Sequence, residues 1–241
     1  MIDPDERERR VIEVLGRWPT ALAGVLIGGY AVAAYGRPRY SVDVDIVATT
    51  SAAEGWTGWL KGLGLALERA PRRFEQGKGT VAFQRWHDST VVVDLLIGGV
   101  RDRRAETVIS DDWIAREPRV LPLELLSGRL DGPVAVVRPE GLWALKLLAG
   151  RPTDLTDLFG ISRQRVRLAE VRELFETLQS PPLERKLAFV ASQLRDEKLY
   201  KDALSRLRLG SPGSEGNRAA WGRFLTMARS AMPPTTHGAS A

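Results

Sequence analysis

The spacing of apolar residues predicts two strands and a helix close together in the first third of the chain. Residues 24–27 form a short apolar run that ends in Gly28–Gly29, which predicts a buried strand entering a glycine turn. Residues 30–35 have a helical composition. Residues 41–48 then alternate between apolar and mostly polar side chains, and this period of two predicts a second strand.

The flanking segments continue this mixture of helices and strands. Asp3–Pro4 has the residue types of a capped helix start, and the apolar positions behind it continue a helix to about residue 18. The further predicted elements are a helix at 51–62, strands at 79–86 and 90–97 joined by a His87–Asp88 turn into a hairpin, and a strand at 134–137.

After residue 138 the pattern becomes helical. The predicted helices are 138–149, 154–159, 163–178, 183–194, 197–209 and 218–232, with a Gly/Ser/Pro linker at 211–216. We therefore expect an α/β (α+β) fold with a mixed sheet and flanking helices in residues 1–138. A helical part would follow in residues 139–232, and residues 233–241 are predicted to be a disordered tail.

Composition narrows the classes of protein and of site. The chain has 241 residues, 44% of them hydrophobic and 27% charged, as in an ordinary soluble globular protein. It contains no cysteine, which excludes a disulfide scaffold, a cysteine-ligated metal and a thiol nucleophile, and its two histidines argue against a histidine cluster. We find no signal peptide and no apolar run that could span a bilayer, so we expect a cytoplasmic protein without a membrane partner.

The charge of the chain allows two interpretations. The formal net charge is +5, and arginine supplies most of the basic residues. Codon usage in a GC-rich genome explains such an excess, whereas contact with phosphate or nucleic acid would use the planar arginine fork. The helical stretch 162–208 is also rich in basic residues, either as a solvated surface or as an RNA-binding face.

Two carboxylates on the second predicted strand suggest a metal site. Asp43 and Asp45 are two residues apart, so they project from one face about 6–7 Å apart along the strand. A divalent cation bound to phosphates relieves their repulsion, because Mg²⁺ prefers carboxylate and phosphate oxygens. Gly28 and Gly29 lack side chains and so allow the backbone to approach a triphosphate. Taken singly, a glycine pair also occurs as tight packing, and an Asp-x-Asp strand as a solvated face.

A third carboxylate, Asp94, interrupts the apolar run VVVDLLIG. An unpaired charge buried there would cost several kcal/mol, so its presence needs a reason. Two-metal phosphoryl transfer uses such a third ligand, and we expect Asp94 to face Asp43 and Asp45. Arg39 and Ser41 flank this edge as candidate phosphate contacts.

These residues resemble the DNA polymerase β-like nucleotidyltransferase superfamily, which has a Gly-Gly or Gly-Ser turn, a helix, an Asp-x-Asp strand and a later carboxylate. Within it, the chain is similar to the bacterial AbiEii/AbiGii-toxin-type nucleotidyltransferases. This closer likeness rests on Arg39-x-Ser41-x-Asp43-x-Asp45 and on the segment LWALKLLAGRPTDLTDL, which contains Lys146, Arg151, Asp154 and Asp157. The likeness covers residues 24–160.

The resemblance implies an enzyme that moves an NMP from an NTP to an acceptor with Mg²⁺ or Mn²⁺. Asp43, Asp45 and Asp94 would bind metal. The nucleotide would contact Gly28, Gly29, Arg39, Ser41 and Lys146, with support from Arg151, Asp154 and Asp157. An AbiEii-like toxin would act on RNA, such as tRNA, and have a cognate antitoxin.

Several alternatives remain open. Lys146 lies among apolar residues, where a lysine also extends its ammonium group from a half-buried helix to solvent. Asp154 and Asp157 share a helix face and also suit the N-terminal end of a helix dipole. The acceptor would instead be a small hydroxylated molecule in an aminoglycoside- or lincosamide-type enzyme. A non-catalytic nucleotide-binding module is the remaining alternative.

Overall fold

The protein, represented by a computed structural model, is described over residues 3–68, 72–76 and 79–234. These divide into two compact units: residues 1–101 with 108–142, and residues 102–107 with 143–241. The predicted disordered tail lies outside the described residues from position 235 onward. Within the described ranges, the helices are too short or too polar to cross a membrane.

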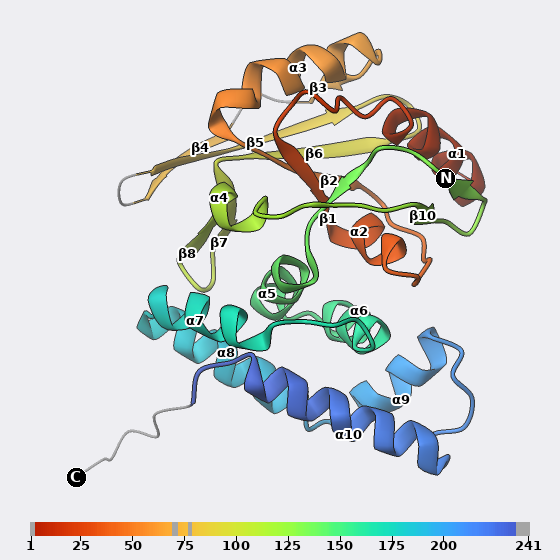
Figure 1. Cartoon of the computed structure of the whole chain (residues 1–241), viewed down its shortest axis with the longest axis vertical. Helices are drawn as coiled ribbons and strands as arrows, with labels where there is room; N and C mark the ends of the chain where they lie inside the picture. Colours follow the sequence, from red (N-terminus) through yellow and green to blue (C-terminus); the bar gives the residue numbers. More distant parts are fainter. Residues whose placement is uncertain (1–2, 69–71, 77–78, 235–241) are drawn as a thin grey trace. The chain divides into compact units, whose positions relative to one another are not determined.

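The first unit is built on a mixed sheet, as the sequence predicts, and the sheet has eight strands (Figure 1). Its order is β3-β5-β6-β2-β1-β12-β9, with β4 paired to β5. Neighbours β1 and β2 are antiparallel, whereas β2 and β6 are parallel, as are β1 and β12. The strands are β1 Gly24–Ile27, β2 Val44–Ala48, β3 Ala66–Leu67, β4 Arg72–Gln76, β5 Gly79–His87, β6 Val92–Ile97, β9 Arg119–Val120 and β12 Ala135–Val136.

Both faces of the central strands are buried. Val25, Leu26, Ile46 and Leu95 are fully inaccessible to solvent. Such strands appear as continuous apolar runs in the sequence. Residue 28 ends β1 with a positive φ of 70°, so β2 has no partner on that side beyond Asp45. Strand β2 therefore begins at Val44, three residues later than predicted.

Helices and two small ribbons complete the first unit, except that the tip of one ribbon, residues 102–107, belongs to the second unit. The helices are α1 Pro4–Leu15, α2 Gly28–Ala34, the 3₁₀ turn η1 Thr50–Ala52, α3 Ala53–Gly62, α4 Asp111–Ile114 and the start of α5 Pro139–Ala149. Strands β7 Gly99–Asp102 and β8 Thr107–Ser110 form one ribbon, and β10 Leu123–Glu124 and β11 Arg129–Leu130 form the other.

Helix α1 is attached to the rest of the first unit by polar contacts as well as by its apolar face. The Asp3 side chain accepts a hydrogen bond from the Asp5 amide at its start, and Pro4 occupies the first turn. Glu8 is fully buried, and its Oε2 accepts a hydrogen bond from the Ser127 amide at 2.7 Å. This carboxylate joins α1 to the β10–β11 ribbon.

The second unit is helical. It contains the remainder of α5, α6 Pro152–Ile161, α7 Leu168–Thr177, α8 Pro181–Gln193, α9 Glu197–Arg206 and α10 Glu215–Ser230. Its core includes an aromatic cluster in which Trp221 lies 4.9 Å from Phe159, 5.1 Å from Phe224 and 5.3 Å from Tyr200 between ring centroids. Helix α7 begins five residues later than predicted, because the polar segment 163–167 offers no apolar face to bury.

Leu26→Ala tests the central position of β1. Because the Leu26 side chain is fully buried, its truncation should lower the free energy of unfolding by about 2–5 kcal/mol. Leu126 in the same unit is 51% exposed, and the matched change Leu126→Ala should cost about 1 kcal/mol or less. Urea unfolding of both variants measures the difference, and equal losses would contradict the burial of β1.

Candidate metal and nucleotide site

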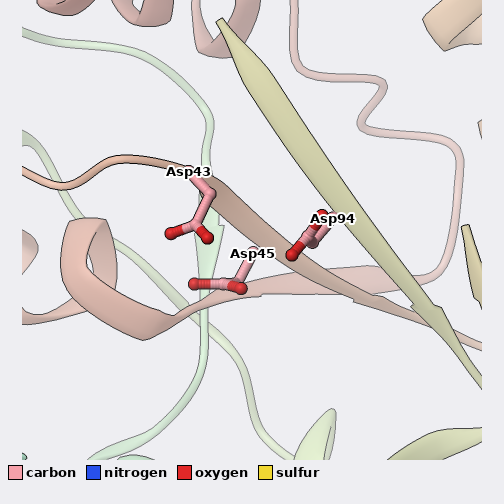
Figure 2. Close-up of side chains that lie close together, drawn as sticks. All are labelled: Asp43, Asp45 and Asp94. Atoms are coloured by element: carbon pink, nitrogen blue, oxygen red, sulfur yellow. The ribbon is translucent and has the colours of Figure 1, made fainter. Parts of the chain in front are cut away.

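The strand register brings the three predicted carboxylates together. Asp43 directly precedes β2, Asp45 is the second residue of β2, and Asp94 lies on β6 directly opposite Asp45. Paired residues on neighbouring strands point to the same face, as do residues two apart on one strand. Figure 2 shows the three carboxylates converging, and one oxygen from each lies within 4.8 Å of the others.

This cluster has the chemistry of a site for a hard divalent cation. At these separations each pair of ionised carboxylates repels by about 3 kcal/mol at an effective dielectric constant of about 20. All the ligand atoms are oxygens, which suit Mg²⁺ or Mn²⁺. Oxygen atoms around an octahedral Mg²⁺ lie roughly 3–4 Å from one another, given metal–oxygen distances of about 2.0–2.1 Å. The three residues could therefore supply three of the six oxygen ligands, and the remaining ligands would come from phosphate or water.

The glycine pair packs directly against this cluster. Gly28 has a φ of 70°, and a β-carbon at this position would fall on the carboxylate of Asp45. A β-carbon on Gly29 would lie 2.5 Å from Ser41 Oγ and 3.0 Å from Arg39 Nη2. Only glycine leaves room for these polar groups, so the glycine pair lets Asp45, Ser41 and Arg39 lie directly against the turn.

The segment before β2 is held in place by hydrogen bonds. Ser41 is buried, and its carbonyl accepts a hydrogen bond from the Tyr30 hydroxyl at 3.2 Å. Arg39 Nη1 donates to the Tyr40 carbonyl at 3.1 Å. The Tyr40 hydroxyl donates to Asp5 on α1 at 2.5 Å, and this hydrogen bond raises the pKa of Tyr40 to about 12. The segment is thus anchored on both α2 and α1.

Asp94 has an ion-pair partner that the sequence analysis did not identify. Arg85 on β5 lies opposite Asp94 and donates from Nε to Oδ1 and from Nη2 to Oδ2, both at 2.7 Å. The hydrogen bond to Asp94 raises the pKa of the guanidinium. The carboxylate in the apolar run is therefore paired.

The other predicted residues gather in the second unit. Lys146 Nζ donates to Asp154 Oδ1 at 2.9 Å and to Asp157 Oδ2 at 2.7 Å. All three side chains are at most 6% exposed. Asp154, in the first turn of α6, also accepts from the Arg151 amide at 3.2 Å and from Arg151 Nε at 2.6 Å. The first unit therefore holds the acidic cluster with the glycine pair, and the second holds a buried lysine network.

The lysine network has a consequence for stability at low pH. Burial opposes ionisation of Asp154, but hydrogen bonds from Arg151 and Lys146 and their charges leave its pKa lowered. A lowered folded-state pKa means that the stabilisation is present above the unfolded-state value of about 4 and is lost as the pH falls through the folded-state pKa.

A family comparison covers nearly the whole chain. The model of the family described as Nucleotidyl transferase AbiEii toxin, Type IV TA system, matches residues 17–237. The match includes every predicted site residue and extends through the helices of the second unit. No protein with a curated description matches the sequence.

Solved structures show weaker similarity. A protein of H. pylori assigned as a nucleotidyltransferase is 16% identical, with 94% of this chain and 92% of that chain covered and a TM-score of 0.40. A Thermotoga maritima protein with the same assignment is 17% identical, with coverages of 63% and 88% and a TM-score of 0.42. The antibiotic-resistance factor ANT(2'')-Ia is 15% identical, with coverages of 85% and 91% and a TM-score of 0.34. These values carry no information on substrate.

Gly28→Ala tests the contact between the glycine turn and Asp45. Alanine at a left-handed position costs about 1–2 kcal/mol, and here its β-carbon also displaces the carboxylate. We expect Mn²⁺ binding, measured by titration calorimetry, to weaken at least about tenfold, because Asp45 would no longer be held in position as a metal ligand. Gly36→Ala is the matched control, because Gly36 has a φ of 82° but open space around it. Equal Mn²⁺ affinity in the two variants would contradict this placement.

Lys146→Met tests the buried lysine network. Removing the ammonium leaves two buried carboxylates without their cation, so we expect about 3–5 kcal/mol of destabilisation. Lys201 is exposed on α9, and Lys201→Met should change stability by no more than about 0.5 kcal/mol. Thermal unfolding near pH 7 measures both. If Lys146→Met retained wild-type stability, the ammonium would be available for another role, such as binding phosphate.

Proposed function

The chain belongs to the AbiEii nucleotidyl transferase toxin family, and on this basis we propose that it transfers an NMP from an NTP to RNA at the site formed by Asp43, Asp45 and Asp94. Membership makes it a nucleotidyltransferase of a type IV toxin–antitoxin system family. The observation that carries the assignment of the site is the convergence of three carboxylates within 4.8 Å beside the glycine turn.

The reaction is an in-line displacement at phosphorus. A bond forms between the acceptor hydroxyl oxygen and the α-phosphorus while the hydroxyl proton passes to a carboxylate of the cluster, such as Asp94, or to water; the bond to the bridging oxygen breaks, and pyrophosphate leaves with that electron pair. Such a reaction depends on positioning and on neutralising charge. A bound Mg²⁺ or Mn²⁺ supplies that charge neutralisation, and Asp43, Asp45 and Asp94 are the residues that would hold it.

The remaining first-unit residues suit the triphosphate. Gly28 and Gly29 have no side chains of their own, and the guanidinium of Arg39 and the hydroxyl of Ser41 lie beside the buried Gly29. Backbone amides and a guanidinium are the donors that phosphate oxygens prefer. We therefore assign these four residues to nucleotide binding.

For the second unit, the contacts support a mainly structural role. Lys146 already donates to two buried carboxylates, and Asp154 is engaged by Arg151 as well. This arrangement joins α5 to α6. The phosphate contact of Lys146, with support from Arg151, Asp154 and Asp157, stays a prediction.

The proposed acceptor is RNA, such as tRNA, and the proposed protein partner is a cognate antitoxin. Support for RNA comes from three exposed arginines in one short segment before α7, namely Arg163, Arg165 and Arg167, of which Arg167 also pairs with Glu170 at 2.9 Å. A phosphate backbone bound at basic residues releases counterions, so affinity for RNA should fall steeply with salt. A small hydroxylated acceptor makes few such contacts and should depend weakly on salt.

Incubation with each labelled NTP and total tRNA tests this function. The wild type should label RNA in the presence of Mg²⁺. Asp43→Asn and Asp45→Asn change charge with little change of shape, and each should lower the rate by at least about a thousandfold, given several kcal/mol from charge stabilisation by the metal. Circular dichroism checks that the variants remain folded.

The controls separate the parts of the proposal. Wild-type labelling by either Asp variant would show that the site is elsewhere. If no nucleotide labels RNA but pyrophosphate is released with a small hydroxylated acceptor, the RNA acceptor is wrong and the enzyme assignment stands. Nucleotide binding without pyrophosphate release would instead indicate a non-catalytic module.

A further inference from the structure

The salt bridge between Arg85 and Asp94 lies within the acidic cluster itself. We propose that Arg85 is a positioning residue that makes this cluster select a metal ion carried by a nucleotide over the bare ion. This inference rests on the proposed function, because it assigns Arg85 a role in loading that same site. It concerns a residue outside the Gly-Gly, Asp-x-Asp and Lys146 motifs.

The geometry fixes Arg85 in place. Strands β5 and β6 are antiparallel, and their register sets Arg85 directly opposite Asp94, just as β2 sets Asp45 on the other side of Asp94. The guanidinium fork engages both oxygens of Asp94, each at 2.7 Å. A bidentate contact of this kind holds the plane of the carboxylate as well as its position.

The pair leaves part of the guanidinium open to solvent. The Arg85 side chain is 42% exposed, while that of Asp94 is 8% exposed. The pair offsets the cost of burying the Asp94 charge, and the exposed part of Arg85 can still meet a ligand at the cluster. Glu68 lies 3.9 Å from Arg85 Nε, so the shorter contacts of the guanidinium are those to Asp94.

Charge gives Arg85 opposite effects on two ligands. The three carboxylates attract a bare divalent ion, whereas the guanidinium beside them repels it. A metal–triphosphate complex carries a net negative charge of about two, so the same guanidinium attracts it. Because Arg85 contacts both carboxylate oxygens of Asp94, the repulsion and the attraction both act over a short distance. The residue therefore disfavours loading by metal alone and favours loading by the metal–nucleotide complex.

Arg85→Gln tests this inference by binding measurements without turnover. Titration calorimetry compares Mn²⁺ alone with Mn²⁺ plus an NTP analogue that has a methylene group between the α- and β-phosphorus. For Arg85→Gln we expect bare Mn²⁺ to bind on the order of tenfold more tightly, and the Mn²⁺–analogue complex to bind more weakly than to the wild type. Arg73→Gln removes the same charge from an exposed position on neighbouring β4 and should change neither affinity.

A second variant keeps the test decisive if Arg85→Gln does not fold. Arg85→Lys retains the charge and loses the fork, so bare Mn²⁺ should bind as it does to the wild type. Weaker Mn²⁺ binding by either Arg85 variant would overturn the inference, because it would mean that Arg85 only holds Asp94 in place. Unchanged Mn²⁺ binding in Arg85→Gln would overturn it as well.

The two proposals fail in different ways. If the wild type binds the Mn²⁺–analogue complex but transfers no nucleotide to any acceptor, the proposed function is contradicted and the inference on Arg85 stands. If the wild type transfers nucleotide while Arg85→Gln shows no gain in affinity for bare Mn²⁺, the proposed function stands and the inference is wrong.

Discussion

One row of the sheet determines where the chemistry can occur. Ile27, Asp45, Asp94 and Arg85 lie side by side on β1, β2, β6 and β5. Because strand side chains alternate between faces, a shift of one residue in the β2–β6 pairing would turn Asp94 away from Asp45, and a shift in the β5–β6 pairing would turn Arg85 away from Asp94. The fully buried apolar residues on β1, β2 and β6 resist such a shift. The hydrophobic core therefore fixes the register, and the register creates the acidic cluster.

The acidic cluster destabilises the folded state, whereas the hydrophobic core stabilises it. Three carboxylates within 4.8 Å repel each other. Gly28 has a positive φ of 70°, a backbone conformation that residues with a side chain rarely adopt. Functional sites commonly retain unfavourable features of this kind, which the rest of the protein must offset. Here the offset is visible in Arg85, which neutralises one of the three charges, and in the hydrogen bonds of Tyr30 and Tyr40 that hold the preceding segment.

Local patterns in the sequence were sufficient for the parts of the site that depend on one strand or one turn. The spacing of Asp43 and Asp45 fixes their common face, and the fold class predicted from the succession of strands and helices is confirmed. The five strands β3, β9, β10, β11 and β12 have two residues each, too few to show a period, and of these β12 alone was predicted, from the apolar residues 134–137. Likewise, the burial of Lys146 depends on packing between two helices, which no local pattern encodes.

Arg85 was missed because the hairpin was predicted without a register. The bounds of strands 79–86 and 90–97 do not by themselves say which residue faces Asp94. In the structure Asp88 closes the turn by accepting hydrogen bonds from the Thr90 and Val91 amides at 2.7 and 2.8 Å. The resulting register sets Arg85 opposite Asp94.

Helix α1 lies outside the residues matched by the family model, yet it helps to hold the candidate site. The match begins at residue 17, after α1 has ended. Yet Asp5 on this helix accepts the hydrogen bond from Tyr40 next to Ser41, and Glu8 accepts one from Ser127. Helix α1, which lies outside the matched residues, therefore helps to hold the segment that precedes Asp43. Variation in such a segment between relatives can alter how firmly the segment before Asp43 is held without changing a single motif residue.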